Sequence, residues 1–153
     1  MTYDLGVDLG TTYTCVAKSE NGRIDLVQLG HTSPLVQSIV SLRDDGEFVV
    51  GEAAARRSIT DPSHTVREFK RRLGDDSAPL LLGDTEVSAQ ELTGYLLRWV
   101  VDRVSEREGG RPAHVTLTCP ATWGDYRRQL MTDAAATAQL TDVGLLPEPV
   151  AAG

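Results

Sequence analysis

The stretch that decides the fold is GVDLGTTYT, at positions 6–14 of this 153-residue chain. Asp8 ends an apolar, strand-like run, and Gly10, Thr11 and Thr12 follow it in a tight turn. Glycine lets the backbone approach a ligand closely, and successive N–H groups in such a turn form an anion-binding nest. A carboxylate at this point is suited to a hydrated Mg²⁺ ion. The segment therefore fits either a phosphate-binding hairpin or an ordinary β-hairpin with a turn-capping Asp8.

The residues around this stretch predict an antiparallel meander. Strands are expected at 3–9, 13–18 and 23–29, the second rich in β-branched and aromatic side chains. Asn21-Gly22 separates the second strand from the third and is a strong signal for a two-residue hairpin, because both central positions of a type I′ turn need a positive φ.

The middle of the chain alternates short strands with helical segments. Strands are predicted at 38–42 and 47–50, a helix at 51–59, and a helical turn at 65–73 that Gly74 closes.

The last third predicts two helices and two strands. Ser88 and Glu91 form a capping box for a helix that ends near Glu108. A strand at 115–119, a helix from an Asp125 N-cap to about Gln139 and a strand at 143–146 follow.

Together these elements predict an α/β fold with a five-stranded mixed sheet, flanking helices and an inserted α+β subdomain. The last strand–helix–strand unit suits a right-handed parallel crossover onto the opening meander. The core subdomain is expected at 1–37 plus 112–153, and the inserted one at 38–111.

Composition narrows the classes of function. The net charge of −7 disfavours nonspecific nucleic-acid binding. No apolar run is long enough for a membrane span, and the N-terminus does not resemble a secretory signal, so a cytoplasmic protein is expected. Cys15 and Cys119 are expected to be buried free thiols rather than a disulfide. The three histidines, at 31, 64 and 114, match no metal-ligand spacing.

Four segments resemble the Hsp70 chaperone family, in the family's order. GVDLGTTYTCVA at 6–17 is similar to its first phosphate motif, and TVREFKRRLG at 65–74 to the stretch that holds its catalytic lysine. LTCPA at 117–121 and EPVAA at 148–152 resemble two further family signatures. The resemblance implies an actin-like, ribonuclease H-like ATPase lobe that uses ATP/ADP and Mg²⁺.

The resemblance also implies the hairpin's part in an ATP site. Asp8 would hold the hydrated Mg²⁺ ion. Gly10, Thr11, Thr12 and Tyr13 would hold the β- and γ-phosphates through backbone and hydroxyl donors.

The other three segments receive catalytic and relay roles by the same resemblance. Lys70 would stabilise charge near the γ-phosphate, and Glu148 would position water or the Mg²⁺ shell. Pro120 and Arg128 would relay the nucleotide state to a substrate-binding domain. The residues alone allow a plainer interpretation: Lys70 on a solvated basic face, Glu148 in an exposed turn and Pro120 at the end of a strand.

The resemblance covers the first lobe of the family's nucleotide-binding domain. Client polypeptides, a J-domain co-chaperone and a nucleotide-exchange factor are the implied partners of the intact protein. We expect the 153-residue chain to bind ATP weakly and to hydrolyse it negligibly. Two alternatives stay open: a sugar-kinase or actin-like ATPase lobe, and a non-catalytic scaffold derived from such a lobe.

Overall fold

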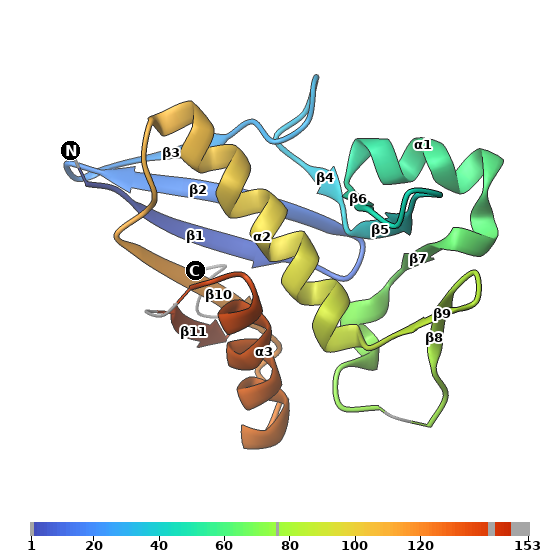
Figure 1. The fold of residues 1–153 in the computed structure, drawn as a ribbon. Coiled ribbons are helices and arrows are strands. Elements are labelled where there is room, and N and C mark those ends of the chain that lie inside the picture. The colour runs from blue at the N-terminus through green and yellow to red at the C-terminus, as the bar shows by residue number, and fades with distance from the viewer. Residues whose placement is uncertain (1, 76, 141–142, 148–153) are drawn as a thin grey trace.

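The computed structural model describes residues 2–75, 77–140 and 143–147. Its main sheet contains β1 (Asp4–Leu9), β2 (Tyr13–Glu20), β3 (Arg23–Val27), β10 (His114–Cys119) and β11 (Val143–Pro147). These strands lie in the order β11-β10-β1-β2-β3 (Figure 1). β1, β2 and β3 are antiparallel neighbours, whereas β10 and β11 add in parallel to β1. The predicted meander and the predicted mixed sheet are confirmed.

The sheet differs from the prediction by one short strand. β4 (Val36–Gln37) pairs with the start of β2, which makes the sheet six-stranded. Sequence patterns did not reveal β4 because two residues are too few to show the period-2 alternation of a strand.

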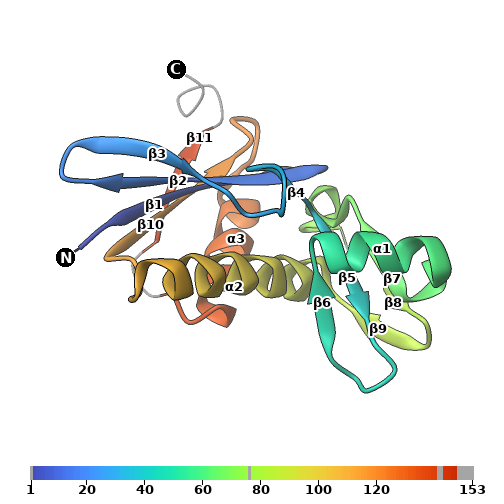
Figure 2. The same ribbon diagram turned by 90° about the horizontal axis from the view of Figure 1, so that it is seen from above.

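Among the described residues, helices cover one face of the main sheet and leave the other face bare. Leu5, Val7 and Leu9 of β1 are buried, while the alternate residues Gly6 and Asp8 point to the other side. The helices α2 (Ala89–Glu108) and α3 (Asp125–Thr137) pack against each other, and Figure 2 shows both on the same side of the sheet. The motif residues of β1 therefore reach the uncovered face.

Local signals explain the length of α2. The Ser88 hydroxyl accepts the Glu91 N–H at 3.0 Å, so the predicted capping box begins the helix. Gly109 ends it in a left-handed conformation with φ 77°. Gly94 lies where α2 crosses α3, and a Cβ there would be 3.0 Å from the Thr137 side chain.

A smaller sheet lies beside the N-terminal half of α2 (Figure 1). It contains β5 (Ile39–Leu42) between β6 (Phe48–Val50) and β7 (Thr65–Arg67), and α1 (Glu52–Thr60) packs on it. Tyr95 of α2 stacks on Phe48 with ring centroids 4.2 Å apart.

Two short 3-10 helices and a hairpin complete this end of the molecule. The 3-10 helices are η1 (Pro62–His64) and η2 (Phe69–Arg72). The hairpin, β8 (Leu80–Leu82) with β9 (Thr85–Val87), had no counterpart in the sequence prediction.

Two predicted local features were wrong. Residues 65–73 do not form a single helical turn, because 65–67 pair with β5 as a strand before η2 begins. The N-cap of α3 is Gly124, and Asp125 is the first helical residue.

The predicted subdomain division remains a prediction. The small sheet and the β8–β9 hairpin do lie within 38–111, apart from the main sheet. However, α2 also falls within that range, and it contacts both α3 and the small sheet. No described helix is long and apolar enough to cross a lipid bilayer.

Candidate functional site

The turn between β1 and β2 has a close backbone contact that only glycine permits. The Gly10 N–H donates to the Tyr13 carbonyl at 3.0 Å. A Cβ at position 10 would lie 2.4 Å from the same oxygen. Glycine at this position therefore serves a close approach, and Thr11 and Thr12 form the tip of the turn.

Ser38, which the sequence analysis did not single out, holds this turn from outside. Its N–H donates to the Thr12 carbonyl at 2.8 Å, and its hydroxyl donates to the Gly10 carbonyl at 2.7 Å. The same hydroxyl lies 2.9 Å from the hydroxyl of Thr14, and both side chains are buried. Two carbonyls of the turn thus have internal partners. A serine before a strand gives no sequence signal for this role.

A cavity of about 640 Å³ lies on the bare face beside the turn. Its volume falls within the range of small-molecule sites. Asp8, Gly10 and Thr11 of the predicted motif contribute to it, together with Thr118 and Thr116 of β10. The cavity also has an apolar part, formed by Ala17, Leu26 and Leu146. The structure therefore brings three predicted phosphate- or Mg²⁺-binding residues together.

A hydrogen bond across the parallel strands orients Asp8. The Thr118 hydroxyl donates to Asp8 Oδ1 at 2.8 Å, from β10 to β1. This bond holds one carboxylate oxygen in place at the cavity wall. Thr118 lies in a segment that resembles the Hsp70 family, but the sequence predicted no role for it. The β1–β10 pairing that brings it to Asp8 joins residues 110 positions apart.

The pKa of the Cys15 thiol depends in part on the charge of Asp8 in the cavity wall. It is the register partner of Asp8 on β2 and also lines the cavity. Burial, and secondarily the negative charge of Asp8, raise the pKa of the Cys15 thiol. Cys15 is half-buried and Cys119 is fully buried, and both are free thiols. The predicted burial is therefore confirmed for Cys119 and only in part for Cys15.

Lys70 does not belong to a solvated basic face. Glu68 adopts a left-handed conformation with φ 57°, which breaks the strand alternation between β7 and η2. As a result Phe69 and Lys70 are both buried, with Lys70 3% exposed, while Arg71 is exposed. A buried ammonium needs compensating partners, because desolvation is costly.

One neighbour of Lys70 is an aromatic ring. The Lys70 Nζ lies 5.7 Å from the centroid of Trp123, within the distance of a cation–π interaction. The backbone N–H of Trp123 donates to the Pro120 carbonyl at 3.1 Å. Trp123 therefore connects two predicted site residues, Lys70 and Pro120, neither of which lines the cavity beside Asp8.

The remaining predicted residues are dispersed. Thr12 and Tyr13 are exposed beside the turn, Tyr13 at 50%, and neither lines the cavity. Arg128 is half-buried in the first turn of α3, where its N–H donates to the Gly124 carbonyl at 3.2 Å. Glu148 lies outside the described residues.

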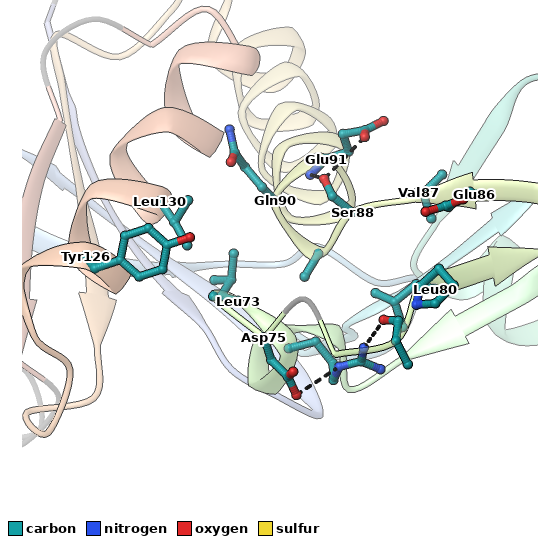
Figure 3. A pocket seen from close by; sticks show the side chains of 15 residues that line it. Leu73, Asp75, Leu80, Glu86, Val87, Ser88, Gln90, Glu91, Tyr126 and Leu130 are labelled. Atoms are coloured by element: carbon teal, nitrogen blue, oxygen red, sulfur yellow. Dashed lines mark hydrogen bonds and ion pairs between the residues drawn. The ribbon is translucent and has the colours of Figure 1, made fainter.

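A second cavity, of about 590 Å³, lies between the segment after η2, the start of α2 and α3 (Figure 3). Leu73, Asp75, Ser88, Tyr126 and Leu130 contribute to it. None of the predicted site residues that the structure describes lines it, so the candidate site is the cavity beside Asp8.

The candidate site has the donor types that a Mg²⁺–phosphate ligand needs. Asp8 offers an oriented carboxylate, and Thr11 and Thr12 at the tip of the turn offer hydroxyls and backbone N–H groups. Mg²⁺ in nucleotide sites is commonly held by one or two carboxylates, retained waters and the phosphates themselves. Within the described ranges no three His, Cys, Asp or Glu side chains gather as a metal cage. The residues present fit the implied group.

Comparison with known proteins identifies the family. The chain is 31% identical over 149 residues to proteins named chaperone protein DnaK from Thermotoga petrophila, Thermotoga maritima and Thermotoga neapolitana. The aligned region covers 97% of this chain and 25% of each relative, so the chain spans about a quarter of their length. The family model described as Hsp70 protein matches residues 4–82, which include the β1–β2 turn and Lys70 and make up just over half of the chain. This chain belongs to the Hsp70 family.

Proposed function

We propose that this chain supplies one wall of an ATP·Mg²⁺ site in an Hsp70-type chaperone ATPase with an actin-like fold. The observation that carries the proposal is the turn at 10–12, which Ser38 holds and which opens beside the oriented carboxylate of Asp8. Successive backbone N–H groups in a turn form concavities that bind anions such as phosphate.

Each residue has a defined part in this proposal. Asp8 binds the waters of the Mg²⁺ ion, and the turn with Tyr13 binds the β- and γ-phosphates. Bound ATP supplies the transferable phosphoryl group. Lys70 stabilises the negative charge that develops on it, since a buried ammonium acts more strongly than a solvated one. Glu148 positions the attacking water.

We extend the proposal to a longer protein like the DnaK relatives. In that protein, ATP hydrolysis is coupled through Pro120 and Arg128 to the binding of client polypeptides. A J-domain co-chaperone and a nucleotide-exchange factor are its further partners, and its location is cytoplasmic. The family match favours the chaperone over the sugar-kinase or actin-like alternative. The non-catalytic scaffold becomes an outcome of the experiments.

Titration of the ¹⁵N-labelled chain with ATP·Mg²⁺ tests the phosphate wall. The amide signals of residues 10–13 are expected to shift, with a dissociation constant weaker than about 1 μM. Asp8→Asn should reduce the Mg²⁺-dependent part of the shift. Asp4→Asn is the matched control, because Asp4 lies on the same face of β1 and hydrogen-bonds His114 at 3.0 Å. Shifts confined to other residues contradict the site, and micromolar or tighter binding contradicts the expected weakness.

Lys70 is tested in a protein that carries both lobes. Lys70→Ala should abolish turnover while ATP binding persists, because the ammonium acts on charge that develops during transfer. Lys18 is the only other lysine, pairs with Glu20 and Glu108 and does not line the cavity beside Asp8, so Lys18→Ala is the control. Unchanged turnover in Lys70→Ala would remove this residue from the mechanism. If the two-lobed protein without substitutions binds ATP but does not hydrolyse it, the non-catalytic scaffold is supported instead.

A further inference from the structure

The outer strand of the main sheet has a free edge. β3 ends the order β11-β10-β1-β2-β3, and Figure 1 shows it along the margin farthest from β11. Among the described residues no strand pairs with its outer side. Arg23 and Glu20 flank the two-residue Asn21-Gly22 turn, and hydrogen-bonded pairs alternate along an antiparallel ladder from such a turn. The N–H and C=O groups of Ile24 and Leu26 therefore point outward.

The side chains of the same two residues are exposed. Ile24 is 73% exposed and Leu26 68%. Both lie on the bare face of the sheet, because the alternate residue Val27 pairs with buried Val16 on the helix-covered side. Edge strands are usually protected by charged residues, by proline or by a bulge. On its bare face β3 presents apolar side chains, and its two charged residues lie on the other face and pair with each other.

The charged residues of β3 are arranged symmetrically about Ile24. Arg23 and Asp25 lie on the other face and form an ion pair of 3.0 Å within the strand, with 81% and 47% of their side chains exposed. Their neighbours on β2 are Glu20 and Lys18, in register. Lys18 also lies 3.1 Å from Glu108 at the end of α2.

This symmetry makes one pairing register with a second β3 favourable. In an antiparallel pair with its two-fold axis at Ile24, each Arg23 faces the other copy's Asp25, and Ile24 faces Ile24. A two-fold axis at Asp25 would place two aspartates opposite each other, which is destabilising. An axis between two residues is excluded, because directly opposite residues of an antiparallel pair point to the same face. An axis at Leu26 would place Asp25 opposite Val27, so the Arg23–Asp25 pairs across the contact would be lost. The charges therefore select the register at Ile24, which also pairs the outward backbone groups of Ile24.

We propose that β3 is a self-complementary interaction edge whose partner is a second copy of this chain. The two sheets join across β3 into one continuous antiparallel ladder, and the Ile24 side chains of both copies meet on the bare face. Such an isologous contact is closed by its own symmetry and stops at the dimer. It is small, so it is reversible and depends on protein concentration. It does not rest on nucleotide binding.

Charge exchange between Arg23 and Asp25 tests the register. Sedimentation equilibrium of the parent chain up to about 1 mM should show a monomer–dimer equilibrium. Arg23→Asp and Asp25→Arg each place like charges opposite one another, and each should raise the dissociation constant about tenfold or more. An equimolar mixture of the two variants should dimerise again, since opposite charges then face each other in the heterodimer. The double variant R23D/D25R should also dimerise.

The turn between β5 and β6 offers a matched control. Arg43 and Asp45 form an equivalent pair two residues apart, at 3.2 Å, away from β3. Arg43→Asp and Asp45→Arg should leave the dissociation constant unchanged. Ile24→Thr keeps a β-branched residue and should weaken the dimer without changing any charge. A parent chain that stays monomeric, or single variants that dimerise like the parent, would overturn the proposal, as would a mixture that stays monomeric while the parent dimerises.

Discussion

The strand β2 has a hairpin turn at each end, and the two turns are built differently. Asn21 and Gly22 both have positive φ, 53° and 79°, and they close the β2–β3 hairpin with two residues. The turn at 10–12 instead connects β1 to β2 through a close contact between Gly10 and Tyr13, and it depends on the distant Ser38. The first turn is a local structure, and the second requires tertiary support.

This difference separates a folding role from a binding role. A type I′ turn matches the twist of its strands and forms from its own residues. A turn that needs outside hydrogen bonds is less favourable by itself, and loops that a rigid scaffold holds in place often carry binding residues. The supported turn is the one that opens into a cavity beside Asp8.

The largest expected effect comes from adding one methyl group to each turn. Gly10→Ala should lower the free energy of unfolding by about 3 kcal/mol, because its Cβ would overlap the Tyr13 carbonyl. Gly22→Ala should cost about 1 kcal/mol, since only the left-handed backbone opposes it and the space is open. Urea unfolding followed by tryptophan fluorescence measures both. Gly6→Ala, with nothing within 4 Å of its Cβ, is the steric control. Equal costs at positions 10 and 22 would contradict the comparison.

A smaller effect is expected when the outside support is removed. Ser38→Ala leaves the half-buried Gly10 carbonyl and the buried Thr14 hydroxyl without this partner, and should cost about 1–3 kcal/mol. Hydrogen exchange at the Gly10 N–H should accelerate, whereas exchange in the Asn21-Gly22 hairpin should not. Ser19→Ala, near the other end of β2, is the control and should cost less than about 0.5 kcal/mol. If exchange rose equally at both ends of β2, Ser38 would act on the whole strand.

The smallest effect concerns the reactivity of Cys15. Its raised pKa keeps the thiolate fraction low at neutral pH, so alkylation by iodoacetamide should be slow and should accelerate as the pH rises toward that pKa. Asp8→Asn removes the charge that is the second cause of the raised pKa, so the rate at fixed pH should rise a few-fold. The fully buried Cys119 should stay unreactive in the native chain. An unchanged rate in Asp8→Asn would mean that burial alone sets the pKa of Cys15.

Local sequence signals predicted the elements that depend on neighbouring residues. The capping box at Ser88 and Glu91 marked the start of α2, and Asn21-Gly22 marked the β2–β3 hairpin. β7 was mistaken for part of a helical turn because it is a strand only through its pairing with β5, more than 20 residues earlier. Three residues show no period that distinguishes strand from helix.

The candidate site divides in the same way. Asp8 and Gly10 at the site, and Lys70 outside its cavity, were predicted from motifs of adjacent residues. Ser38 and Thr118 were missed as contributors to the site, and Trp123 as a neighbour of Lys70, because each acts on a partner that is distant in sequence.

The sequence by itself determined the family, the β1–β2 turn and the residue types at the candidate site, because motifs and turn preferences are short-range. Only the tertiary structure decided that the turn is held by Ser38, that Asp8 is oriented by Thr118 and that Lys70 is buried against Trp123. Hydrogen bonds and burial between residues far apart in the chain depend on how strands pair and helices pack. No local pattern specifies these partners.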